Sequence, residues 1–184
     1  MLETRDREVA ERALVEALER TEVPATWRAP LAVELLPLFE EADSSGRGLG
    51  IVVGRWVIRD DDLSLLDWIA PVVISISAAT VARSPAYTTS AVLGTIAAIF
   101  RFVRTLMRKG ATLSADEARV LAAIKACDEP PTTGVLFERL RDRGIETMAQ
   151  LEDALARLQE VRTRSGLVAL VTQDSRSRWN ISGV

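Results

Sequence analysis

The sequence predicts a mainly α-helical protein: an N-terminal helical region with a short β element, an apolar helical hairpin, and a C-terminal domain of three helices and a β-hairpin. Two observations lead to this fold class. Apolar residues recur at the spacing of one helix face along most of the chain, and several of these segments begin with residues that cap helices. The 184 residues are 48% hydrophobic and 27% charged, as in ordinary globular proteins. We expect three parts, residues 1–62, 63–110 and 111–184.

The segment from Thr4 to Thr21 has the pattern of a helix that docks by one face. Three prolines follow, Pro24, Pro30 and Pro37, and we expect them to break the chain into short pieces, with one or two helical turns within residues 31–42. The apolar stripe of the first helix consists of Val9, Ala10, Ala13, Leu14, Ala17 and Leu18.

Residues 49–58 combine glycine with β-branched and aromatic residues, which predicts a short strand or hairpin. The glycines in and before this segment are Gly46, Gly48, Gly50 and Gly54. A dinucleotide-binding loop follows a strand and opens a helix, whereas these glycines follow an acidic loop and lead into a strand-like stretch. The lysine of a phosphate-binding loop is also absent. We therefore interpret them as turn and bulge glycines.

Residues 63–110 are the most apolar part of the chain and predict two helices joined by a short loop. Asp62 is expected to cap the first helix, and Ser84 with Pro85 forms a start signal for the second. Pro71 falls early in the first helix, where a proline costs least. Residues 72–77 alternate in polarity, however, so a buried strand remains the alternative there.

The same two segments raise the question of a membrane. They contain 15 and 17 consecutive uncharged residues, and a spanning helix needs about 20. Serine and threonine dilute both segments, which favours a soluble hairpin or an interface buried in a homo-oligomer. On the soluble interpretation, Gly94 packs closely against the first segment near Ser75 or Ala79.

Residues 111–184 have the clearest helix signals. A capping box, Ser114 to Glu117, opens the first helix, which ends before the two prolines at 130 and 131. The second helix begins near Thr132 or Thr133 and stops at Gly144. Another box, Thr147 to Gln150, opens the third helix.

The segment after the third helix predicts a β-hairpin. An apolar run at 167–171, a polar turn at 174–178 and the residues 179–181 supply the two strands and their connection. Three helices followed by such a wing resemble the winged helix-turn-helix fold in element order. The resemblance implies that the third helix would enter the DNA major groove if the domain binds DNA.

The residue types argue against catalysis. The chain has no histidine and one cysteine, Cys127, which we interpret as a small buried hydrophobe. The carboxylate groups at 40–41 and 60–62 stand at the ends of apolar segments, where caps and solvated turns explain them. We predict a protein that is not an enzyme and has no metal and no cofactor. The charged, amphipathic N-terminus lacks the pattern of a secretory signal, so the expected localisation is cytoplasmic, with membrane association as the alternative.

Charge is segregated along the chain, with −6 on residues 1–62, +4 on residues 63–110 and −1 on residues 111–184. The expected third helix carries Glu152 and Asp153 among its early, exposed residues, which disfavours phosphate contact. Arginines occur instead at the end of the second apolar helix and around the wing. The candidate partner-binding residues are Arg101, Arg104, Arg108, Gln150, Arg157, Arg162, Arg164, Arg176 and Arg178.

These features favour a non-enzymatic adaptor or regulatory subunit that brings a protein partner to a larger assembly. Small bacterial proteins that join an apolar hairpin to a helix-turn-helix-like module occur as accessory parts of conflict or defence operons, and this likeness of architecture suggests a similar accessory role. Two alternatives remain: a winged-helix transcriptional regulator that binds DNA, and a membrane protein anchored through residues 63–107.

Overall fold

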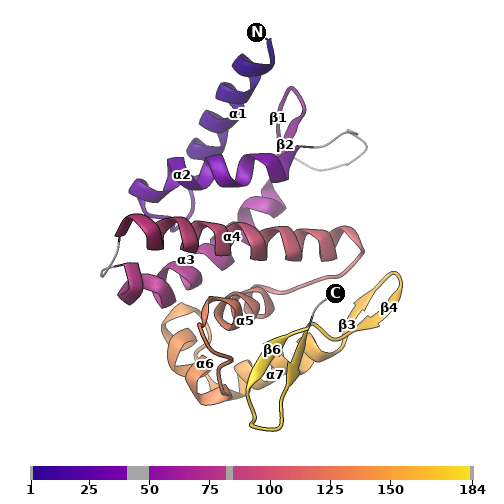
Figure 1. Ribbon diagram of the computed structural model, residues 1–184. Coiled ribbons are helices and arrows are strands. Elements are labelled where there is room, and N and C mark those ends of the chain that lie inside the picture. The colour runs from indigo at the N-terminus through magenta and orange to yellow at the C-terminus, as the bar shows by residue number, and fades with distance from the viewer. Residues whose placement is uncertain (1, 41–49, 82–84, 183–184) are drawn as a thin grey trace. The chain divides into compact units, whose positions relative to one another are not determined.

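The computed structural model describes residues 2–40, 50–81 and 85–182 and is mainly α-helical, as the sequence predicts (Figure 1). The chain forms two compact units, Met1–Asp67 and Trp68–Val184. The three segments expected from charge and pattern therefore do not correspond one to one with the compact units. The helices of the middle segment fall largely in the same unit as the C-terminal segment.

The first unit is built from α1 (Leu2–Leu18), α2 (Ala25–Leu35), the 3₁₀ helix η1 (Leu36–Phe39), and the strands β1 (Gly50–Val53) and β2 (Trp56–Arg59). Helix α1 contacts α2, η1 and β1. The predicted stripe of α1 supplies much of the core, although Val9 is 45% exposed. Large buried side chains of this unit are Leu14, Leu18, Leu31, Leu35, Leu36, Phe39, Trp56 and Ile58.

Pro30 lies inside α2, so the prediction that it breaks the chain was wrong. Its missing N–H removes one hydrogen bond from the helix. The residues that follow it, Leu31, Ala32 and Leu35, are all buried, and this burial favours a continuous helix. Pro24 stands at the N-cap, where a proline costs nothing.

Strands β1 and β2 form the predicted hairpin, with Val53 paired to Trp56 across a two-residue turn. Gly54 in this turn has a φ of 54°, which an L side chain adopts only with strain. The interpretation of Gly54 as a turn glycine is confirmed. Gly46 and Gly48 lie outside the described residues.

Helix α3 (Asp60–Val81) begins before the predicted cap, so Asp62 lies within the first helical turn. Three aspartates in that turn complement the positive end of the helix dipole. Residues 72–77 are helical, and the alternative of a buried strand was wrong. Pro71 lies in the helix interior. The buried positions Leu65, Leu66, Ile69, Ala70, Val72 and Val73 recur at helical spacing, which outweighs the local alternation.

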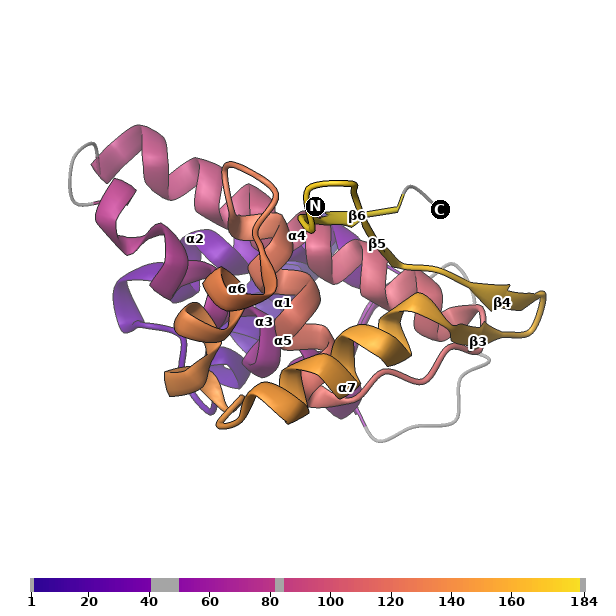
Figure 2. The ribbon, with the colours of Figure 1, turned by 90° about the horizontal axis from the view of Figure 1, so that it is seen from below.

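The second unit contains α4 (Pro85–Arg108), α5 (Ala115–Ala126), α6 (Thr133–Leu140), the 3₁₀ helix η2 (Arg141–Arg143) and α7 (Met148–Gln159). Pro85 opens α4 as predicted, whereas Ser84 lies outside the described residues. Helix α5 is central, because it contacts α4, α6, α7 and the last strand (Figure 2). Six apolar residues of α5 between Ala118 and Ile124 are buried, as this central position requires.

Gly94 does not pack closely on another element, and that prediction was wrong. The residue is exposed, and a Cβ added there would meet no atom within 4 Å. Its neighbours Val92, Leu93 and Ile96 turn toward the core, so Gly94 lies on the outer face of α4. The side chain of Ala79 lies outside the described residues.

Two antiparallel strand pairs follow α7, where the sequence predicted one hairpin. Strand β3 (Val161–Thr163) pairs with β4 (Gly166–Val168), and β5 (Val171–Gln173) pairs with β6 (Trp179–Ile181). The predicted apolar run is divided at Leu170, which is fully buried. Its N–H donates to the carbonyl of Leu158 at 2.8 Å, and this bond to α7 ends one pair and starts the next.

Candidate functional site

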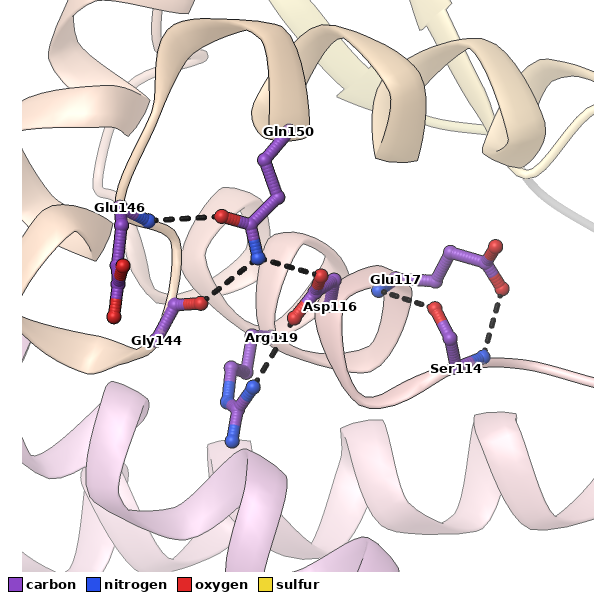
Figure 3. Close-up of polar contacts among 7 residues, drawn as sticks. All are labelled: Ser114, Asp116, Glu117, Arg119, Gly144, Glu146 and Gln150. Carbon is purple, nitrogen blue, oxygen red and sulfur yellow. Dashed lines mark hydrogen bonds and ion pairs between the residues drawn. The ribbon is translucent and has the colours of Figure 1, made fainter.

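The start of α7 is joined to α5 by a polar network centred on Gln150 (Figure 3). Gln150 Nε2 donates to Asp116 Oδ2 at 2.8 Å and to the carbonyl of Gly144 at 3.0 Å. Its Oε1 accepts the N–H of Glu146 at 3.0 Å. Asp116 also accepts a hydrogen bond from Arg119 Nη1 at 3.1 Å. The capping box that opens α5 lies beside this network.

The side chain of Gln150, which the sequence suggested as a partner contact, is instead bonded within the chain. Both amide hydrogens and the amide oxygen of Gln150 are already used within the chain. The predicted cap at the start of α7 is confirmed in part, since Thr147 Oγ1 accepts the N–H of Gln150. The returning bond of the Gln150 side chain goes to Glu146, one residue before the cap. Gln150 therefore fixes the position of α7.

The exposed face of α7 is acidic. Its other face is buried through Leu151, Ala154, Leu155 and Leu158, so the outward positions are set by the helical period. Arg157 is the basic residue of that face and forms an ion pair with Asp153 at 2.9 Å, with both side chains more than 60% exposed. The exposed residues of α7 and its C-cap are Met148, Ala149, Glu152, Asp153, Ala156, Arg157, Gln159 and Glu160.

The arginines of α4 do not share one exposed face. Arg101 and Arg108 are exposed, but Arg104 is only 7% exposed, and its guanidinium lies 6.0 Å from the centre of the Phe100 ring. The helical period places position 104 near 101 and 108, and it is the packing of α4 that buries the Arg104 side chain beside Phe100. The prediction of Arg104 as a surface contact is corrected by this burial.

Two basic segments that are far apart in the sequence meet in the second unit. The N–H of Arg164, in the turn of the β3–β4 pair, donates to the carbonyl of Lys109 at 3.0 Å. A Cβ added to Gly110 would come within 2.7 Å of Arg164 Cγ, so the side chain of Arg164 lies against this junction. Arg162, Arg164 and Lys109 are all exposed. The arginines at the end of α4 and around the wing are visible in the sequence, but no local pattern signals that the two segments meet.

The arginines of the other turn are held by carboxylates. Asp174 Oδ1 accepts the backbone N–H groups of Arg176 and Arg178 at 2.8 and 2.9 Å. The hydrogen bond from Arg178, followed by that from Arg176 and both positive charges, lowers the pKa of Asp174. The side chain of Arg178 pairs with Glu129 at 3.4 Å. The carboxylate of Asp174 thus shapes the backbone of the turn.

Cys127 is half-buried at the C-cap of α5 and is less enclosed than the sequence suggested. Its thiol donates to the carbonyl of Ala123 at 3.0 Å, and Arg139 Nη1 donates to its sulfur at 3.4 Å. Desolvation raises the pKa of Cys127, which lowers the thiolate fraction and hence the reactivity. Among the described residues, no group of three or more cysteines and carboxylates is arranged to hold a metal ion.

One stretch of the described residues, Thr89–Arg108, is long and apolar enough to cross a membrane. Within the apolar 18-residue window of this stretch, 44% of the positions are buried inside the structure. Buried core helices of soluble proteins have the same length and composition, so this feature alone does not choose between the two environments.

The chain was compared with protein-family models, with curated proteins and with solved structures, and none of them matches.

Proposed function

We propose that the protein is a non-enzymatic adaptor or regulatory subunit that docks a protein partner through the exposed acidic face of α7. The observation that carries this proposal is the charge of that face. Glu152, Asp153 and Glu160 are exposed, and Arg157 is paired with Asp153. A partner that fits this face presents basic and apolar groups.

The same face argues against sequence-specific DNA binding by α7. In a winged-helix-like arrangement the third helix reads base edges with hydrogen-bond donors near its start. Here Gln150 is engaged with Asp116 and Gly144, and Glu152 and Asp153 would face phosphates. Affinity for DNA depends on neutralising phosphates, so two carboxylates in this position weaken it.

Charge reversal tests the proposal. The full chain is used to isolate partners from its native cells, in parallel with the double variant Glu152→Arg/Asp153→Arg. We expect one protein at constant stoichiometry that is retained by the unaltered chain and lost with the double variant. The matched control is Glu8→Arg/Glu16→Arg, which makes the same charge change at exposed positions of α1 and retains the partner.

The isolated partner is then titrated against the purified chain as salt is raised. Affinity that falls with ionic strength supports an electrostatic contact at the acidic face. The proposal is overturned if every co-isolated protein is retained equally by both double variants. Sequence-specific DNA binding tighter than about 1 μM that is lost on Arg157→Ala also overturns it.

A second candidate function is DNA binding through the sugar–phosphate backbone. It is favoured by the junction at which Arg164 contacts Lys109, with Arg162 exposed two residues before it, because such a basic group grips phosphates without reading bases. Under this alternative, Arg162→Ala/Arg164→Ala weakens binding to random duplex and reduces its salt dependence, measured by fluorescence anisotropy. This alternative is removed if the unaltered chain and the double variant bind random duplex DNA equally weakly.

The membrane alternative rests on the length and composition of Thr89–Arg108. It requires that the untagged protein pellets with membranes and resists carbonate extraction. Recovery of the protein in the detergent-free supernatant removes this alternative, and carbonate-resistant pelleting removes the soluble adaptor.

A further inference from the structure

A cavity of about 370 Å³ lies in the second unit between α4, α5 and the end of β6. The volume is within the range of small-molecule sites, roughly 300–1,000 Å³. Most of its lining is apolar, and Lys125 supplies the charge. The lining residues are Ala98, Ile99, Phe102, Leu121, Lys125, Ile181 and Ser182.

Lys125 also lines a second cavity, of about 340 Å³, which has a polar lining. Ser77, Thr95 and Arg139 contribute hydroxyl and guanidinium groups there. Asp128 also lines this second cavity, so Lys125 lies where an apolar space adjoins a polar space that contains charges of both signs. Lys125 of α5 is the residue that lines both cavities.

The ammonium of Lys125 is available to a ligand. The side chain is exposed, and it has no ion-pair partner among the residues that the structure describes. An exposed ammonium beside an apolar cavity attracts an anion and offers apolar surface to the rest of the same molecule. A ligand that satisfies both features is amphipathic and negatively charged at one end.

We propose that the cavity between α4, α5 and β6 binds a small carboxylate with an apolar body, such as a medium-chain fatty acid. The carboxylate pairs with Lys125. The hydrocarbon chain lies against Ile99, Leu121 and Ile181. The cavity shares no lining residue with the exposed face of α7, so ligand binding and protein docking can be tested independently.

Decanoate is the probe, used below its micelle concentration and titrated into the full-length protein by calorimetry and by ligand-observed NMR. We expect saturable binding of decanoate with one site per chain. Decanol keeps the hydrocarbon and lacks the charge, so it binds at least about tenfold more weakly, and decyltrimethylammonium does not bind.

Two substitutions separate the charge from the cavity. Lys125→Met weakens decanoate at least about tenfold and leaves decanol unchanged, because it removes the ammonium and keeps an apolar stem. Ala98→Trp places a large ring at an exposed rim position and blocks both ligands. The matched control is Lys109→Met, which changes the other lysine of the chain and leaves binding intact.

The unaltered protein provides a measurement that needs no variant. Decanoate should protect Lys125 from acylation, with Lys109 as the internal reference, when both are quantified by peptide mass spectrometry. The proposal is overturned if decanoate fails to bind below about 1 mM, if Lys125 is not protected, or if Lys109→Met weakens binding as much as Lys125→Met. Concentration-dependent dimerisation that protects Lys125 without ligand assigns the cavity to a second copy of the chain and also overturns it.

Discussion

The two strand pairs that follow α7 have the same length and pairing but different tertiary connections. In the β5–β6 pair, Trp179 is 7% exposed, its Nε1 donates to Thr133 Oγ1 at 3.0 Å, and its N–H donates to the carbonyl of Pro131 at 2.8 Å. In the β3–β4 pair, Leu167 is 66% exposed. Short strand pairs are marginal on their own, so burial decides how firmly each is held. The β5–β6 pair is held in the core through Trp179, whereas the β3–β4 pair buries Val161 and Thr163 of β3 and exposes Leu167 of β4.

Trp179→Ala should show the largest effect of this difference. Loss of the buried ring is expected to lower the free energy of unfolding by about 3–5 kcal/mol, whereas Leu167→Ala changes it by less than about 0.5 kcal/mol. Urea denaturation followed by circular dichroism measures both. Equal effects would show that the two pairs are held alike.

Helix α7 contains the same contrast between a residue engaged in the structure and one at the surface. Gln150→Ala removes the partner of Asp116, Gly144 and Glu146 and is expected to cost about 1–3 kcal/mol. Arg157→Ala removes an exposed ion pair worth less than about 1 kcal/mol. Thermal and urea unfolding of the two variants decide the ranking, and a larger loss for Arg157→Ala would contradict it.

Two glycines sharpen the comparison between strained turns and open helix surface. Gly94 lies on the outer face of α4 with no atom within 4 Å of an added Cβ, so Gly94→Ala should raise stability by about 0.5–1 kcal/mol. Gly166, in the β3–β4 turn, has a φ of 126°, and Gly166→Ala should instead lower stability, because an alanine is strained there. Opposite signs are expected in denaturant unfolding. A loss of stability in Gly94→Ala would contradict this prediction and would indicate that α4 packs closely on a neighbour at Gly94.

The smallest expected effect is a local titration in the β5–β6 turn. Hydrogen bonds hold the folded pKa of Asp174 below its unfolded value, so its contribution is fully present above the ordinary aspartate pKa of about 3.9. It declines as pH falls through the lower, folded pKa. NMR should show the amides of Arg176 and Arg178 shifting together in that acidic range. Asp174→Asn removes the titration, and the β3–β4 amides serve as the control that stays constant.

Local signals in the sequence determined the elements of the second unit well. The capping box at Ser114 and Glu117 and the N-caps Thr132 and Thr147 fixed three helix starts, because a cap depends on atoms within four residues of one another. The turn at Gly54 and the helix stop at Gly144 follow from positive φ in the same way. The absence of histidine likewise restricted the chemistry without any structure.

Only the tertiary structure decided which of the polar residues face outward. Helix periodicity placed Arg104 close to Arg101 and Arg108, and the packing of α4 buried it against Phe100. The engagement of Gln150 with Asp116 joins residues 34 positions apart, and the bond from Arg164 to Lys109 joins two basic segments. Sequence patterns set the local geometry because it depends on near neighbours. Contacts between distant segments depend on how whole elements pack, so the engagement of Gln150 and the cavity at Lys125 emerged only from the folded chain.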